Sequence, residues 1–147
     1  MIDEGHEVGN HAWSDEKSVL RPLLQLEQQI KDVHALLPDN PNGSRYFRPG
    51  GGFFTDEMVR VVKGMGYRTV LGCIYPHDPQ ISNAGINARQ VLSMVRPGGI
   101  IIMHDRRGHS VKQLELVLRG MKERGWGVVS LGELLAIWEK FNGKKSG

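Results

Sequence analysis

The sequence predicts an α/β fold, either an α/β barrel or a doubly wound sheet, in which parallel strands alternate with helices. Two observations predict it. Short apolar segments alternate with amphipathic segments along the whole chain, and polar clusters follow several of the apolar segments directly. Because parallel strands bring their carboxyl ends to one rim, where α/β proteins place functional groups, we expect these polar clusters to share a rim.

The chain is long enough for one domain, which we place at residues 1–141, followed by a flexible basic tail at 142–147. A formal charge of +3 is too small an excess to indicate a nucleic-acid partner. The single cysteine, Cys73, excludes an internal disulfide. We find no signal peptide and no apolar stretch of membrane-spanning length, so the compartment stays unknown.

The first part of the chain is predicted to contain two strands and two helices. Residues 7–10 form a short strand with no earlier strand to pair with, so we expect the chain to be shortened at its N-terminus. Apolar residues at steps of three and four predict a helix over 18–37. Residues 45–48 form a strand, 49–52 a turn, and Thr55 begins a helix that ends near Gly64.

The second half of the chain continues the alternation. Ser130 and Glu133 form a capping box for the last helix, and Gly125 ends the helix before it. The unbroken apolar segment 100–103 predicts a strand covered on both faces. The remaining predicted elements are strands at 68–73 and 127–129, a loop at 76–87, and helices at 88–95 and 111–124.

His11 and Asp15 are four residues apart, so on a helical turn they present an imidazole and a carboxylate on one face. Both groups are ligands that a divalent ion of the zinc type accepts. The alternative interpretation is a helix cap or a surface ion pair. Trp13 lies between them and either packs or forms a wall of the site.

Arg48 precedes a proline and the glycines at 50–52. The N–H groups of Gly50 and Gly51 are sterically open, and they could stabilise a developing oxyanion. The alternative is an ordinary turn beside a solvated charge.

His104 ends the apolar segment 100–103, and a buried histidine needs a partner. Asp78 or Asp105 could orient its ring so that it acts as a general acid. The alternative is a histidine that is satisfied within the core.

The order of these clusters resembles the polysaccharide deacetylase family, the NodB-like carbohydrate esterases, and in particular its chitin-deacetylase-like branch. The resemblance is carried by segments 5–15 (GHEVGNHAWSD), 47–52 (FRPGGG) and 97–105 (PGGIIIMHD), with Asp78 in the loop 75–79 (YPHDP). It implies a distorted (β/α) barrel, incomplete at the N-terminus. It also implies a divalent metal, most often Zn²⁺, that activates water to hydrolyse N-acetyl groups on a polysaccharide containing N-acetylglucosamine.

The resemblance also implies roles for individual residues. His11 matches a metal-ligating histidine, and Asp15 stands where most members carry a second one. Arg48 matches the arginine that positions the catalytic base. Gly51 matches the residue whose N–H helps to hold the oxyanion.

Asp78 and His104 match the aspartate and histidine that cooperate in protonating the leaving amine. The family's paired aspartates, one a metal ligand and the other the general base, have no counterpart in this sequence. We therefore expect an incomplete metal site and a weak or inactive chain. The alternative function is a non-catalytic relic that binds a glycan or a protein partner, and an exposed sheet edge makes a homodimer possible.

Overall fold

The computed structural model describes residues 1–142, and these divide into two compact units. Met1–Leu71 form the first unit, and the second unit begins at Gly72. Each unit has its own hydrophobic core and is described by itself. Within the described residues, none of the helices is long and apolar enough to cross a bilayer.

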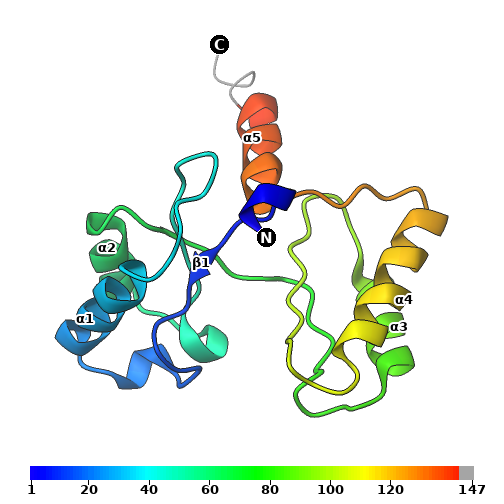
Figure 1. Cartoon of the computed structure of the whole chain (residues 1–147), viewed down its shortest axis with the longest axis horizontal. Coiled ribbons are helices and arrows are strands. Elements are labelled where there is room, and N and C mark those ends of the chain that lie inside the picture. The colour runs from blue at the N-terminus through cyan, green and yellow to red at the C-terminus, as the bar shows by residue number, and fades with distance from the viewer. Residues whose placement is uncertain (143–147) are drawn as a thin grey trace. The chain divides into compact units, whose positions relative to one another are not determined.

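The first unit combines a small sheet with two helices (Figure 1). Strands β1 (Gly9–Asn10), β2 (Tyr46–Phe47) and β3 (Arg68–Thr69) form a parallel sheet in the order β1-β2-β3. The helices are α1 (Leu23–His34) and α2 (Asp56–Gly64), and the three short 3₁₀ turns are η1 (Ile2–Glu4), η2 (Ser18–Leu20) and η3 (Gly50–Gly52). The prediction of parallel strands connected by helices is confirmed here.

Register within this sheet places the ends of β1 and β2 side by side. Gly9 pairs with Tyr46 and Asn10 pairs with Phe47, so the chain leaves both strands at the same edge. The core lies between the sheet and the two helices and consists of Leu26, Ile30, Phe47, Met58, Val62 and Tyr67. The polar segments after β1 and β2 are therefore neighbours.

Helix α1 begins five residues later than the sequence predicts. Pro22 forces Arg21 into an extended conformation, with φ −95° and ψ 142°, and this separates the 3₁₀ turn at Ser18–Leu20 from the helix. Helix α2 begins as predicted, because the Thr55 side chain accepts a hydrogen bond from the Met58 N–H at 3.2 Å.

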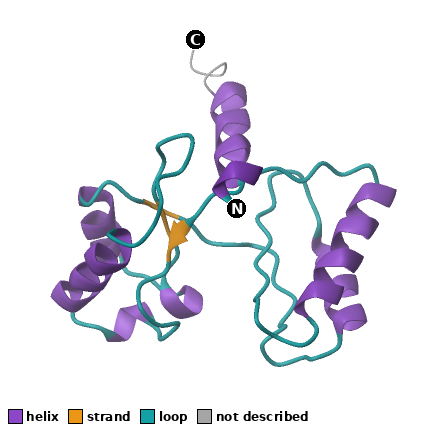
Figure 2. Cartoon of the chain, in the orientation of Figure 1, coloured by secondary structure: helices purple, strands orange, loops and turns teal. Residues whose placement is uncertain are grey.

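The second unit is built from helices and extended loops, with no strand longer than a single bridge in its described part (Figure 2). Helix α3 (Ala84–Met94) packs against α4 (Ser110–Glu123), and α5 (Leu131–Asn142) follows. The core consists of Ile74, Ala88, Val91, Val117 and Met121. Of the predicted tail at 142–147, Asn142 is the last residue of α5 and the rest lies outside the described residues.

Two predicted strands of the second unit are wrong. In segment 100–103 only Ile101 forms a bridge, parallel to Ile74, and the four residues are half-buried. Segment 127–129 is irregular, and the side chains of Val128 and Val129 are exposed. Apolar runs become strands only where a neighbouring strand pairs with them, and the described residues supply one partner for the first segment and none for the second.

Helix boundaries in this unit follow capping groups. Helix α3 begins at Ala84, four residues before the predicted start, because the Asn83 side chain accepts the Ile86 N–H at 3.0 Å. The end of α4 is confirmed: Gly125 has φ +72°, and the N–H groups of Gly125 and Trp126 donate back to the last turn of the helix.

The predicted capping box of α5 is also confirmed. The Ser130 N–H donates to the Glu133 carboxylate at 3.1 Å, and the Glu133 N–H donates to the Ser130 hydroxyl at 3.3 Å. A cavity of about 570 Å³ lies beside this helix, with a mostly apolar lining that includes Ile100, Trp126 and Leu134. None of the candidate site residues lines it.

Candidate active site

The predicted site residues fall into two groups, one in each compact unit. The first group comprises His11, Asp15, Arg48 and the glycines at 50 and 51, which follow β1 and β2. The second comprises Asp78 and His104.

His11 contacts two partners through its two ring nitrogens. Its Nδ1 lies 2.6 Å from the backbone oxygen of Arg48, and its Nε2 lies 2.8 Å from Asp15 Oδ1. A carbonyl oxygen only accepts, so Nδ1 carries a hydrogen and donates to Arg48. The second nitrogen is thereby aimed at the Asp15 carboxylate, as the metal-facing nitrogen of a ligating histidine is when a carbonyl holds the other.

A turn, and not the predicted helix, brings His11 and Asp15 together. Ala12 has φ +57°, a left-handed conformation, and its N–H donates to Asn10 Oδ1 at 2.9 Å. Asn10 is fully buried, and its amide also donates to Ile30 O at 2.9 Å and contacts the Tyr67 hydroxyl at 3.3 Å. Asn10 therefore fixes the turn that carries His11, a role that the sequence analysis did not assign.

The His11 and Asp15 pair fits a divalent ion as two ligands of a larger set. Tetrahedral zinc with bonds of about 2.1 Å separates adjacent ligand atoms by roughly 3.4 Å. The observed 2.8 Å would have to open by roughly 0.6 Å, and the Asp15 side chain is 61% exposed, which leaves it room to move. Among the described residues, no cluster of three or more histidine, cysteine or acidic side chains could hold a metal.

Arg48 and the glycine turn lie next to this pair. The Arg48 N–H donates to Asn10 O at 3.0 Å, while its half-buried guanidinium forms no hydrogen bond or ion pair with any described residue. The Gly50 N–H already donates to the Ser18 hydroxyl at 2.7 Å. Gly51, with φ +66°, has no described acceptor for its N–H, so Gly51 is the glycine of the two that has a donor free for an oxyanion.

The second group is a buried aspartate that holds a histidine. The Asp78 side chain is 1% exposed, and its two oxygens accept hydrogen bonds from His104. The backbone N–H of His104 donates to Oδ2 at 2.6 Å, and the ring Nδ1 donates to Oδ1 at 2.9 Å. The other ring nitrogen, Nε2, is left to face outward from a side chain that is 20% exposed.

The Asp78 carboxyl has a lowered pKa. Desolvation by burial acts to raise it, but the hydrogen bonds from the backbone and ring of His104, the charge of that ring and the Gln113 amide together outweigh the burial. Asp78 is therefore a carboxylate at neutral pH and accepts hydrogen bonds only.

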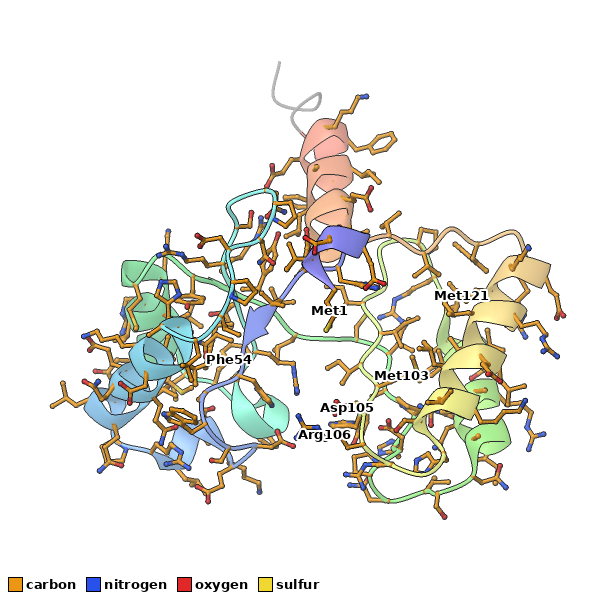
Figure 3. All side chains as sticks on the ribbon, in the orientation of Figure 1. Met1, Phe54, Met103, Asp105, Arg106 and Met121 are labelled. Atoms are coloured by element: carbon orange, nitrogen blue, oxygen red, sulfur yellow. The ribbon has the colours of Figure 1, made fainter. Side chains whose placement is uncertain are left out.

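The sequence allows either Asp78 or Asp105 to orient His104, and in the structure Asp78 does so. Asp105 is 89% exposed and lies 3.6 Å from the guanidinium of its neighbour Arg106. Figure 3 shows Asp105 and Arg106 on the loop that follows Met103. A pair this exposed contributes little to stability.

Residues with strained backbone conformations lie next to both groups of site residues. In the described part of the chain, the non-glycine residues with positive φ are Ala12, His77 and Arg106. Ala12 follows His11, His77 precedes Asp78, and Arg106 lies two residues after His104. Such conformations cost about 1–3 kcal/mol each and concentrate at functional sites.

Residues at the start of α4 form hydrogen bonds with both members of the Asp78–His104 pair. The sequence patterns did not predict these contacts. The Ser110 hydroxyl donates to His104 O at 2.7 Å, and His109 Nε2 donates to Asp78 O at 3.1 Å. The Gln113 amide lies 3.4 Å from Asp78 Oδ2. The spacing of these three residues, at positions 109, 110 and 113 of one helix start, is the signal that could have found them.

The chain is similar to several proteins of known class. The family model described as polysaccharide deacetylase matches residues 1–70. A peptidoglycan-N-acetylglucosamine deacetylase from Bacillus cereus is 29% identical over 140 residues, which cover 92% of this chain and 66% of that protein. A chitooligosaccharide deacetylase from Azorhizobium caulinodans is 32% identical over 107 residues, 69% of this chain and 50% of that protein.

Solved structures show the same fold. Peptidoglycan deacetylase PdaC from Bacillus subtilis matches with a TM-score of 0.83 at 23% identity, over 99% of this chain and 71% of that one. An acetyl xylan esterase from Clostridium thermocellum in complex with a cobalt ion matches with a TM-score of 0.81 at 27% identity, over 93% and 67% of the two chains. A CE4 family pseudoenzyme from Bacillus anthracis matches with a TM-score of 0.80 at 23% identity, over 91% and 48%.

Residues 1–70 match the polysaccharide deacetylase family, and the chain has the α/β fold of the solved deacetylase structures. It spans 66% or less of the length of the curated relatives named above. The predicted family and fold class are both confirmed.

Proposed function

We propose that this chain carries the site of a metal-dependent deacetylase that hydrolyses N-acetyl groups on a polysaccharide containing N-acetylglucosamine. The observation that carries the proposal is the Asp78–His104 pair. A buried carboxylate holds Nδ1 of the histidine and directs Nε2 outward, which is the arrangement a general acid requires. The activity, the substrate and the metal are all part of the proposal.

In this reaction His104 acts on the leaving group. Its Nε2 donates a proton to the amine nitrogen as the C–N bond to the acetyl carbon breaks, and acetate leaves. Asp78 stays ionised and holds the ring by Nδ1 throughout. Ring orientation by a carboxylate of this kind preserves the correct tautomer during proton transfer.

The first group would bind the metal and the reacting carbonyl. His11 Nε2 and the Asp15 carboxylate are the candidate ligands, and the Arg48 backbone oxygen holds the His11 ring in the required tautomer. When bound, a divalent ion activates a water molecule and polarises the acetyl carbonyl. The Gly51 N–H would donate to the oxyanion. The Arg48 guanidinium, which has no partner among the described residues, would be available to pair with an anionic group beside the metal.

The substrate class is inferred from relatives. One curated relative is a peptidoglycan-N-acetylglucosamine deacetylase and another is a chitooligosaccharide deacetylase. An N-acetylglucosamine unit is common to both substrate names. We therefore propose this sugar unit as the substrate, within a chitin-type glycan as the sequence motifs suggest, with peptidoglycan as the competing polymer. The similar esterase with a bound cobalt ion supports a divalent metal.

Zinc calorimetry tests the metal site directly. We expect the chain to bind Zn²⁺ and the His11→Ala variant to lose that binding, whereas His6→Ala, which removes an exposed histidine of the same unit, should bind as the parent does. Equal binding by the parent and His11→Ala would overturn the metal assignment. Because catalytic zinc has three protein ligands and the described residues bring two together, we expect weak binding and slow turnover.

Acetate release tests the reaction. With excess protein and Zn²⁺, the parent should release acetate slowly from a chitooligosaccharide or from peptidoglycan, and His104→Ala should release at least about a hundredfold less, the usual contribution of a general acid. The preferred polymer identifies the substrate. Equal release by both proteins would show that His104 is not the acid.

A second function is favoured by one specific observation, the similarity to a CE4 family pseudoenzyme. On this alternative, the chain binds a glycan or a protein partner without catalysis. The expected result is glycan binding that His11→Ala and His104→Ala leave unchanged, with no acetate released. Loss of glycan binding in both variants would place the ligand at the candidate active site instead.

A further inference from the structure

Behind the Asp78–His104 pair lies a buried polar chain that the proposed reaction does not use. Gln113 on α4 is 1% exposed and Asn87 on α3 is fully buried. The Asn87 amide nitrogen lies 2.8 Å from Gln113 Oε1, and the Gln113 amide nitrogen lies 3.4 Å from Asp78 Oδ2. The contacts therefore run from Asn87 through Gln113 to Asp78.

The donor and the acceptor of each hydrogen bond from Asn87 through Gln113 to Asp78 can be assigned. Asn87 Nδ2 also lies 2.8 Å from the backbone oxygen of Ile81, which only accepts, so this end of the Asn87 amide must be the NH₂ group. The Gln113 atom that faces it is then the oxygen, and the Gln113 NH₂ group faces Asp78. An ionised Asp78 requires a donor at that position.

An amide side chain that is buried between two helices destabilises the fold unless other groups replace its hydrogen bonds to water. Taking an amide out of water costs roughly 1–3 kcal/mol when its hydrogen bonds are not replaced, and Asn87 Oδ1 has no partner in the described structure. The surrounding contacts between α3 and α4 are apolar, with Val91, Val117 and Met121 in the core. Apolar residues at 87 and 113 would avoid this cost, so the amides require an explanation beyond packing.

We propose that Gln113, held in orientation by Asn87, is a positioning residue that keeps the Asp78 carboxylate turned toward the His104 ring. The catalytic meaning of this inference rests on the proposed function, because His104 is the acid in that proposal. The described hydrogen bonds of the Gln113 side chain reach Asn87 and Asp78 and not the His104 ring, so Gln113 acts through Asp78. The titratable groups that face Asp78 in the described contacts are His104 and His109, from the loop before α4 and from its start.

The purely structural alternative makes a different prediction. If the two amides only join α3 to α4, their removal changes the free energy of unfolding and leaves the titration of Asp78 as it was. If Gln113 positions the carboxylate, its removal changes the Asp78 titration and the His104 ring signals in a protein that is still folded.

NMR titration of the labelled chain separates these alternatives. In Gln113→Met, the Asp78 carboxyl should titrate at a higher pH than in the parent, by about half a unit, because one hydrogen bond to its charged form is lost. The ¹⁵N signals of the His104 ring should broaden or move toward a mixture of tautomers. Gln90→Met, which changes an exposed glutamine on α3, is the matched control and should leave both readouts unchanged.

A second variant covers the case in which Gln113→Met does not fold, since that variant leaves the Asn87 amide without its acceptor. The double variant Asn87→Leu with Gln113→Met removes both amides together, so that neither amide is left facing an apolar side chain, and the remaining cost is the lost donor to the Ile81 backbone oxygen and to Asp78. It should fold and show the same shift in the Asp78 titration. An unchanged titration in a folded variant, or a double variant that does not fold, would overturn the proposal.

These readouts need neither metal nor substrate. If the Asp78 titration changes in Gln113→Met while the parent binds no zinc, the positioning role of Gln113 is supported and the proposed metal-dependent function is wrong. If the parent binds zinc and the Asp78 titration is the same in Gln113→Met, the metal site is supported and the positioning role of Gln113 is wrong.

Discussion

The His11 ring donates through Nδ1 to the backbone oxygen of Arg48, 2.6 Å away, and this bond links the segment after β1 to the segment after β2. It leaves Nε2 facing Asp15. Sequence separation between the two residues is 37 positions, so only the parallel pairing of β1 and β2 brings them together.

The first prediction concerns Asp15 as a metal ligand. Asp15→Asn keeps the shape of the side chain but removes the charge that a divalent ion prefers, so zinc affinity should fall about tenfold or more. Calorimetry measures it, with Asp3→Asn, an exposed acid of the same unit, as the control. An affinity equal to that of the parent would assign Asp15 to a surface ion pair with His11.

The second prediction concerns Asn10, which fixes the turn that carries His11. Asn10→Ala removes bonds to Ile30 O and the Ala12 N–H from a fully buried position. Unfolding free energy should fall by about 2–3 kcal/mol, because buried partners are left unsatisfied. Urea unfolding measures the loss. Asn42→Ala, at an exposed asparagine, should cost less than about 0.5 kcal/mol, and equal costs would contradict the assignment.

The third prediction compares two glycines of one turn. A Cβ on Gly50 would lie 2.0 Å from the backbone oxygen of Glu16, whereas a Cβ on Gly52 would meet nothing within 4 Å. Gly50→Ala should therefore cost about 3 kcal/mol or more through displaced backbone. Gly52→Ala should cost about 1 kcal/mol, because its φ of +75° strains any side chain. Similar urea midpoints for the two variants would show that the backbone at Gly50 relaxes freely.

The fourth prediction is a pH dependence set by Asp78. Its folded pKa is lowered, so the unfolded chain binds the proton first as the pH falls. The stabilisation is complete above the ordinary aspartate range, near pH 5, and it is lost as the pH falls from about 4 through the folded pKa. Asp78→Asn should destabilise the second unit by about 2 kcal/mol at neutral pH and flatten this acid dependence.

Urea unfolding at a series of pH values between about 2 and 7 checks this prediction, because that range spans the ordinary aspartate pKa. Asp105→Asn is the matched control, since its carboxylate is exposed and forms only a long contact with Arg106. A parent and an Asp78→Asn variant whose stabilities fall in parallel would show that another group is responsible.

Sequence patterns predicted capping well because capping is local. Thr55, Gly125 and the pair Ser130 and Glu133 act on N–H or C=O groups within a few residues of themselves, and the structure confirms each. Strand predictions were less successful, since a strand exists only when another segment pairs with it. Segments 100–103 and 127–129 have strand-like composition, but their described neighbours do not complete a ladder.

The sequence by itself determined the family, the parallel α/β pattern and the residues that carry chemistry, because these depend on residue type and order along the chain. Tertiary structure alone decided which aspartate holds His104, which glycine keeps a free N–H, and that Asn87 and Gln113 stand behind Asp78. Those relationships join residues 26 to 35 positions apart, and their hydrogen bonds depend on orientation and burial that only the folded chain defines.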